Sequence, residues 1–244
     1  MQNIGNNLKK NKKVFILGAS SDIGIKTTQV YLNNNWKVFA HYNQNKKELE
    51  NIKERNLKLI KFDLKKIKNF RNFTNKAKFL KTIDSFISLT GYLKPTNFSK
   101  INTNTFYDHI NVNYLSNLFV LQKILPNMSK NYFGRILFSS STGIKFGGGK
   151  ETLIYSLTKY MNEFFLSTYY DYFKNNVLIN TIRIGVTDTK IHKKIRNKDL
   201  KKRINLIPIK RIASSDEVAN YLYFYGSEKN TLTTKSIIDI TGGE

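Results

Sequence analysis

Short apolar runs alternate with longer mixed segments along this chain. The runs cover residues 14–17, 36–40, 57–60, 83–89, 135–138, 177–184 and 237–240. Continuous apolar runs of this length are typical of strands buried on both faces. The segments between them, for example residues 23–32, 103–128 and 153–173, are long enough to form helices.

This alternation predicts an α/β fold. Parallel strands joined by right-handed helical crossovers build a doubly wound, Rossmann-type sheet, here of about seven strands with helices on both faces. The chain contains no internal repeat and no linker rich in Pro, Gly or Ser. We therefore expect a polar N-terminal tail over residues 1–12 and a single domain over residues 13–244.

Composition excludes several classes of protein. The chain has no cysteine, so disulfides, thiolate metal sites and a cysteine nucleophile are ruled out. Its three histidines (His41, His109 and His192) are too widely spaced to suggest a metal site. No apolar run approaches the ~18 residues of a membrane span, and the N-terminus lacks the apolar segment of a secretory signal. We expect a soluble, cytoplasmic protein.

The formal net charge is +24, from 41 Lys plus Arg and 17 Asp plus Glu. Basic proteins bind phosphate backbones, so a nucleic-acid partner has to be considered. However, Lys, Asn and Ile, at 34, 30 and 27 residues, are also the residues that AT-rich codons favour. Mutational bias therefore explains much of the excess, and we do not expect nucleic acid as a partner.

A glycine-bearing turn follows the first apolar run. Backbone N–H groups in such a turn, together with the N-terminus of the next helix, bind the pyrophosphate of a dinucleotide. A simple strand–helix turn is the alternative. The candidate cofactor residues here are Gly18, Ser20, Ser21, Asp22, Ile23 and Gly24.

The ends of the second and third runs bear on the choice of cofactor. An acid after the second strand would bind the ribose 2′-hydroxyl of NAD and repel the 2′-phosphate of NADP. Tyr42 and Asn43 stand there instead, with Lys46 and Lys47 before the first acid, so the sequence favours NADP over NAD. Asp63 and Leu64, after the third run, are candidates for the adenine pocket; alternatively, Asp63 caps a helix.

Carbonyl reduction needs a proton donor, and a tyrosine with a lysine four residues later on a helix can supply one. The spacing occurs four times, at Tyr42/Lys46, Tyr155/Lys159, Tyr170/Lys174 and Tyr225/Lys229, and chance alone produces about two such matches in this composition. Context selects the pair at Tyr155 and Lys159. Ser139, Ser140 and Ser141 end the preceding apolar run, where a hydroxyl can bind a substrate carbonyl.

Several motifs in the correct order resemble those of the short-chain dehydrogenase/reductase family, from Lys13 to Glu244. The turn resembles T-G-x-x-x-G-x-G, with Leu17 for the threonine and Asp22 for the middle glycine. Gly91 is retained from N-N-A-G. Asn113, Ser140, Tyr155 and Lys159 fall on the family's catalytic positions. Residues 180–189 resemble N-x-x-x-P-G-x-x-x-T, with Ile184 in place of the proline.

The resemblance implies roles for these residues. Tyr155 would be the general acid, and Lys159 would lower its pKa and bind the nicotinamide ribose. Ser140 would orient the carbonyl, with Ser139 and Ser141 as alternatives. Asn113, or its neighbour Asn111, would hold a water in a proton relay. Further cofactor contacts would come from Gly91, Gly185, Thr187 and Thr189.

The resemblance implies an NADP-dependent oxidoreductase that interconverts a carbonyl and a secondary alcohol. A 3-oxoacyl-acyl-carrier-protein reductase and a sugar or polysaccharide-pathway reductase are both open. The alternative is a non-catalytic member of the fold that binds dinucleotide or nucleic acid as a regulator.

Residues 190–203, which by resemblance would form the family's substrate loop, contain eight Lys or Arg against one acid, Asp199. They suit an anionic or carrier-linked substrate, although lysine bias explains them equally well. We expect a homodimer or homotetramer, with Phe164, Phe165, Tyr169, Tyr170 and Tyr172 as candidate interface residues.

Overall fold

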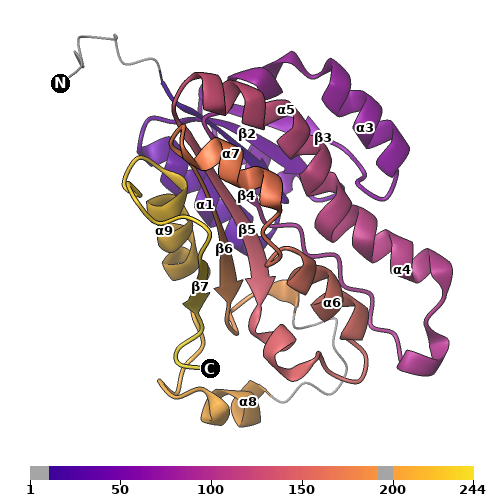
Figure 1. The fold of residues 1–244 in the computed structure, drawn as a ribbon. Coiled ribbons are helices and arrows are strands. Elements are labelled where there is room, and N and C mark those ends of the chain that lie inside the picture. Colours follow the sequence, from indigo (N-terminus) through magenta and orange to yellow (C-terminus); the bar gives the residue numbers. More distant parts are fainter. Residues whose placement is uncertain (1–10, 192–199) are drawn as a thin grey trace.

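A single sheet of seven parallel strands forms the centre of the molecule (Figure 1). The computed structural model describes residues 11–191 and 200–244. In spatial order the strands are β3, β2, β1, β4, β5, β6 and β7. Their bounds are Lys13–Leu17 for β1, Lys37–Tyr42 for β2, Leu57–Lys61 for β3, Ser85–Ser88 for β4, Gly134–Ser141 for β5, Val177–Ile184 for β6 and Ile237–Ile240 for β7. The order confirms the predicted doubly wound sheet.

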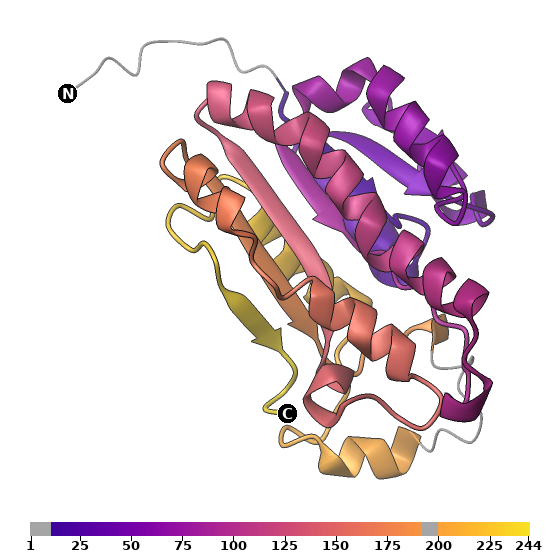
Figure 2. The same cartoon turned by 45° about the vertical axis from the view of Figure 1, so that its right-hand side comes forward.

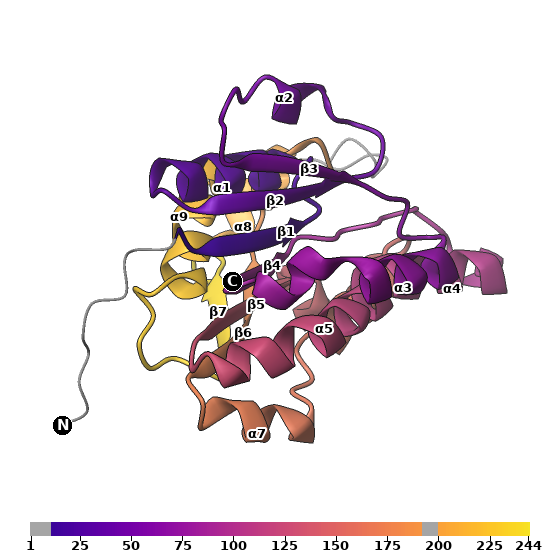
Figure 3. The same ribbon diagram turned by 90° about the horizontal axis from the view of Figure 1, so that it is seen from above.

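Helices cover both faces of the sheet. One face carries α1 (Asp22–Asn33) and α9 (Ser215–Gly226). The other face carries α3 (Ile67–Lys76), α4 (Thr103–Ile110), α5 (Ser116–Lys130), α6 (Leu153–Met161) and α7 (Tyr170–Phe173), as Figures 1 and 3 show. Two short helices lie apart from these layers: α2 (Lys47–Glu50) follows β2, and α8 (Leu200–Leu206) lies beyond the carboxyl ends of the strands.

Strand β1 illustrates why the central strands read as continuous apolar runs. Val14 and Ile16 pack into the cluster under α1 and α9, whereas Phe15 and Leu17 pack into the cluster under α5. All four side chains are fully buried. Because successive side chains of a strand point to opposite faces, both faces need apolar residues when helices cover both. Each such side chain stabilises the fold by roughly 1.5–3 kcal/mol.

The edge strands differ from the expectation of burial on both faces. In β3 every position is exposed or half-buried, and Ile237 in β7 is 42% exposed. These strands are hydrogen-bonded on one side only, and the helical layers do not cover them fully. The expectation was wrong for them because apolar content alone does not distinguish a central strand from an edge strand.

The helix expected over residues 153–173 is also interrupted, and the long helix over residues 103–128 contains a π-helical turn at Asn111–Leu115. Helix α6 ends because Asn162 forms tertiary hydrogen bonds. Its carbonyl oxygen accepts from Thr181 Oγ1 at 2.6 Å, and its amide donates to Asn113 O at 3.0 Å. The Thr181 hydroxyl therefore takes the carbonyl oxygen that a continuing helix would use, and the side-chain amide holds Asn162 against the π-turn.

Two predicted segments fall partly outside the described residues. Residues 1–10 of the polar tail and residues 192–199 of the basic segment belong to this group. Within residues 11–191 and 200–244, no helix has the length and apolarity that crossing a membrane requires. The same ranges contain no cluster of His, Asp or Glu suited to a metal ion.

Candidate active site

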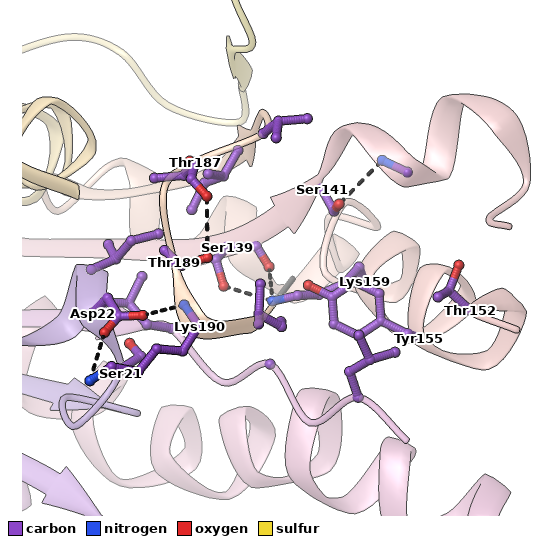
Figure 4. A pocket seen from close by; sticks show the side chains of 18 of the residues that line it. Ser21, Asp22, Ser139, Ser141, Thr152, Tyr155, Lys159, Thr187, Thr189 and Lys190 are labelled. Carbon is purple, nitrogen blue, oxygen red and sulfur yellow. Dashed lines mark hydrogen bonds and ion pairs between the residues drawn. The ribbon is translucent and has the colours of Figure 1, made fainter. Parts of the chain in front are cut away.

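A cleft of about 1360 Å³ opens at the carboxyl edge of the sheet. This edge, where the strand order reverses between β1 and β4, is where α/β proteins bind ligands. Figure 4 shows side chains from α1, β5, α6 and the segment after β6 converging on it. The predicted site residues among its lining are Ser20, Ser21, Asp22, Ile23, Gly91, Ser140, Tyr155, Lys159, Gly185, Thr187 and Thr189.

Other predicted residues lie outside the lining. These are Gly18, Gly24, Tyr42, Asn43, Asp63, Leu64 and Asn113. Leu64 is buried in the core beneath α5, and Asp63 Oδ1 accepts a hydrogen bond from Lys65 N at 3.1 Å. Asp63 therefore stabilises its own turn, and it is not the N-cap of α3, which is Lys66.

The first turn is closed by its own serine. Ser21 is the N-cap of α1: its Oγ accepts from Gly24 N at 3.1 Å and donates to Gly18 O at 2.9 Å. Gly18 has a φ of +86°, which L-residues with a side chain rarely adopt. A Cβ on Gly24 would lie 2.6 Å from Gly18 O, so only glycine permits this close approach. The turn thus presents the N-terminus of α1 to the cleft, the arrangement that binds phosphate groups.

His41, at the end of β2, supports this turn from behind. Gly18 N donates to its Nδ1 at 3.2 Å, and its Nε2 lies 3.1 Å from Phe62 O. This geometry suits a neutral ring protonated on Nε2. Burial lowers the pKa of His41 to about 4, so the ring is uncharged at neutral pH. It ties the ends of β1 and β3 together. The sequence offers no local signal for this role.

Lys190 joins two acids at the end of the cleft next to α1. Its backbone N donates to Asp22 Oδ2 at 2.7 Å, and its Nζ lies 2.7 Å from Glu48 Oε1. All three residues line the cleft. The charge of Asp22, which stands where the family has a glycine, is therefore compensated by a residue 168 positions away. Sequence reasoning missed this role of Lys190.

The two lysines after β2 lie at the same end. Lys46 pairs with Glu50 at 2.9 Å, one helical turn further on. Lys47 also lines the cleft, next to Glu48. An acid and lysines therefore share the region in which the sequence predicts a 2′-phosphate.

The three consecutive serines at the end of β5 have different surroundings. Ser139 Oγ accepts from Lys159 Nζ at 2.8 Å, and Ser141 Oγ accepts from Gly143 N at 3.2 Å. Ser140 Oγ is buried and has no hydrogen-bond partner among the described residues. A buried hydroxyl without a partner is costly, so the cleft-lining Ser140 is the serine available to a ligand.

Lys159 is held deep in the cleft. Its Nζ donates to Thr90 O at 2.7 Å, Ser139 O at 2.9 Å and Ser139 Oγ at 2.8 Å. Burial lowers the pKa of Lys159 to about 7. At a pKa of about 7 the amine is only partly protonated near neutral pH.

Tyr155 stands beside Lys159, whose Nζ lies 5.8 Å from the centre of the tyrosine ring. Both side chains project from α6 toward the cleft (Figure 4). Burial raises the pKa of Tyr155 to about 12. In this arrangement burial prevails over the lowering that the resemblance implies, and the tyrosine holds its proton at neutral pH.

Asn113 lies behind the cleft on the π-turn and is fully buried. Its side chain accepts from Tyr92 N at 2.7 Å and donates to Tyr92 O and Thr158 Oγ1, both at 3.0 Å. Its main-chain oxygen accepts from the amides of Asn117 and Asn162. Asn113 thus connects the loop after β4 to α6 next to Lys159.

The sequence profile of the short chain dehydrogenase family matches residues 12–200. The chain belongs to the short-chain dehydrogenase family. It is therefore an oxidoreductase, as the order of its motifs predicts.

Two relatives represent the sequence similarity to this dehydrogenase. The uncharacterized oxidoreductase YmfI of Bacillus subtilis is 23% identical over 241 residues, which cover 96% of this chain and 98% of YmfI. The 3-oxoacyl-[acyl-carrier-protein] reductase FabG of Aquifex aeolicus is 28% identical over 162 residues, 66% of this chain and 65% of FabG.

Solved structures confirm the fold of this dehydrogenase. ElxO with NADP bound superposes with a TM-score of 0.82 at 22% identity, covering 96% of this chain and 98% of ElxO. A 3-oxoacyl (acyl-carrier-protein) reductase from Agrobacterium tumefaciens C58 with NADP bound superposes with a TM-score of 0.84 at 20% identity, covering 96% of this chain and 95% of that protein.

Proposed function

We propose that this dehydrogenase uses NADP(H) to interconvert a carbonyl and a secondary alcohol, with a 3-oxoacyl group on a carrier as the substrate. The convergence of Ser140, Tyr155 and Lys159 in one cleft carries this proposal. The FabG relatives support the substrate class. A sugar or polysaccharide-pathway ketone remains the competing substrate.

The residues of the first turn fit a dinucleotide. Only glycine fits the Gly18–Gly24 contact, and the residues at the N-terminus of α1 line the cleft. Lys47 supplies positive charge for phosphate groups, and Gly185, Thr187 and Thr189 also line the cleft. When bound, the nicotinamide supplies or accepts the hydride.

The residues of the chain perform the proton transfer. Tyr155, kept protonated by its raised pKa, donates its proton to the oxygen of the substrate as negative charge develops there. The Ser140 hydroxyl donates a hydrogen bond to the same oxygen and orients the carbonyl. Lys159, when protonated, stabilises the tyrosinate that remains. Ser139 and Asn113 act as positioning residues, through Lys159 Nζ and through Thr158.

The test follows NADPH oxidation with acetoacetyl-coenzyme A as substrate. We expect Tyr155→Phe to lower kcat by about 10²- to 10⁴-fold, the contribution of a positioned general acid, while NADPH still binds. Tyr225→Phe is the matched control, because Tyr225 belongs to a second Tyr-x-x-x-Lys pair outside the cleft. Full turnover by Tyr155→Phe would overturn the catalytic assignment, and equal affinity for NADH and NADPH would overturn the cofactor assignment.

A further inference from the structure

Arg203 is a cation on the wall of the cleft that the proposed chemistry does not use. It projects from α8, which lies below the turn after β5 and the start of α6 (Figure 2). Its side chain is 23% exposed, and its guanidinium carbon lies 5.8 Å from the centre of the Phe146 ring. Both residues line the same cleft as Tyr155. Contact with an aromatic ring restricts the orientation of a guanidinium plane.

A buried acid holds Arg203 from outside the cleft. Glu244 Oε1 pairs with Arg203 Nη2, and the Glu244 side chain is only 3% exposed. The second carboxylate oxygen, Oε2, is buried without a hydrogen-bond partner among the described residues. Burying a carboxylate is costly unless a cation compensates it, and Arg203 is the cation that pairs with it.

A tight turn before Glu244 places this acid under α8. Gly242 and Gly243 have φ values of +70° and +95°. A Cβ on Gly242 would lie 2.7 Å from Ile209, and a Cβ on Gly243 would lie 2.9 Å from Pro208. The turn therefore packs directly against the residues that follow α8, and Ile209 N donates to Gly242 O at 3.3 Å. The turn at Gly242 and Gly243 and the segment after α8 therefore pack closely beside the Arg203–Glu244 ion pair.

We propose that Arg203 binds a carboxylate or phosphate group of the substrate, and that Glu244 is the positioning residue that holds its guanidinium against the cleft. The guanidinium has five N–H donors in a planar fork, and Glu244 contacts one of its nitrogens. The remaining donors can form the paired hydrogen bonds that planar oxyanions accept. This inference rests on the proposed carbonyl chemistry and adds the class of group that the substrate carries.

Two pairs of substrates distinguish the two sources of such an oxyanion. Within each pair the reacting ketone is the same. One pair is acetoacetyl-phosphopantetheine and its neutral truncation, acetoacetyl-N-acetylcysteamine. The other is ethyl 3-oxohexanoate and its analogue with a terminal carboxylate. For the anionic member that Arg203 recognises, we expect Arg203→Gln to raise KM by about 10- to 100-fold, as for a lost hydrogen bond to a charged group. Its kcat, and the KM of the neutral partner, should change by less than about threefold.

Loss of preference for phosphopantetheine identifies the group as the phosphate of a carrier arm, and loss of preference for the terminal carboxylate identifies an acidic acyl chain. Equal effects on the anionic and neutral members of both pairs, or no effect, would overturn the proposal. If Arg203→Gln does not fold, Arg203→Lys tests the proposal instead, because lysine keeps the positive charge but lacks the planar fork of N–H donors. We expect it to reduce the preference for the anionic member by about 3- to 10-fold, and an unchanged preference would overturn the proposal.

The role of Glu244 has its own readout. Glu244→Ala should raise KM for the anionic member alone, and Glu244→Gln should restore most of the loss by keeping an acceptor for Arg203. Arg211→Gln is the matched control, because Arg211 pairs with Glu217 at 2.8 Å outside the cleft. If wild-type protein reduces neither member of either pair, the proposed function fails. If it reduces them and Arg203→Gln leaves the preference intact, only the anion site fails.

Discussion

At the scale of single residues, burial and hydrogen bonding determine which protonation states this site uses. His41 is an example. Its two nitrogens join Gly18 N to Phe62 O, and this link requires the neutral ring. A protonated ring would lose its acceptor for Gly18 N and would place a charge in a nearly waterless environment. The conformation of the turn after β1 is therefore coupled to pH through a residue that lies outside the lining of the cleft.

His41 should make the protein less stable in acid. Its pKa is about 4 in the folded protein, against 6.5 for an unperturbed histidine, so the unfolded chain binds its proton more readily. The contribution to the free energy of unfolding is complete above pH 6.5 and is lost as the pH falls from 6.5 to 4, by about 3 kcal/mol. His41→Gln lacks this titration. We therefore expect the difference in free energy of unfolding between wild type and His41→Gln to shrink by about 3 kcal/mol as the pH falls from 6.5 to 4.

Urea unfolding at pH 4, 5, 6, 7 and 8 measures this gap. Because carboxylates titrate in both proteins, the difference between the two curves is the informative quantity. Parallel curves for wild type and His41→Gln over this range would contradict the prediction.

At the scale of elements, the junction of β1 and α1 depends on a glycine within a helix. Gly to Ala usually stabilises a helix by about 1 kcal/mol, through backbone entropy. At Gly24 the added Cβ would lie 2.6–2.7 Å from backbone atoms of Gly18 and Ala19, which cannot yield as a side chain can. Steric overlap therefore outweighs helix propensity at this position.

We expect Gly24→Ala to lower the free energy of unfolding by about 1–3 kcal/mol, the usual cost of overpacking, and to weaken NADPH binding. Denaturant unfolding and fluorescence titration with NADPH measure the two effects. Gly91→Ala is the control for stability, because its Cβ would have no neighbour closer than 3.9 Å. A Gly24→Ala protein as stable as wild type would show that α1 can shift without cost.

At the scale of the whole molecule, the net charge of +24 acts on stability as well as on partners. Like charges repel one another in the compact state, and salt screens this repulsion with a Debye length of ~10 Å at 0.1 M. We expect the melting temperature to rise by roughly 2–4 °C between 10 and 200 mM NaCl, which corresponds to about 1 kcal/mol for a chain of this size.

Calorimetry at fixed pH measures this rise. A variant in which the exposed Lys58, Lys81 and Lys100 are replaced by Gln should show a smaller rise, because it carries less charge to screen. A melting temperature that falls with salt would mean that attractive ion pairs dominate the electrostatic free energy instead.

Association of the whole molecule stays a prediction. Of the five aromatic residues proposed for an interface, Phe164 and Tyr170 are 69% and 53% exposed. Tyr169 is buried, and Phe165 and Tyr172 pack against the core. Two of the five are therefore available for contact with a second copy.

The sequence by itself determined the features that depend on neighbouring residues. Apolar runs defined the strands, and the four-residue spacing placed Tyr155 and Lys159 on one turn of α6. The glycines at 18 and 24 indicated the turn that Ser21 caps. These patterns are encoded within a few residues, because helix periodicity, strand alternation and capping are local physics.

Tertiary structure alone decided how distant residues pair. The order of the strands brings Lys190 to Asp22 and Glu48, and the turn at Gly242 brings Glu244 to Arg203. The tertiary structure also distinguished two of the three consecutive serines: Ser139 is hydrogen-bonded to Lys159, whereas Ser140 Oγ has no partner among the described residues. These differences depend on which elements pack together. The packing minimises the free energy of the whole fold, so no single segment of the sequence determines it.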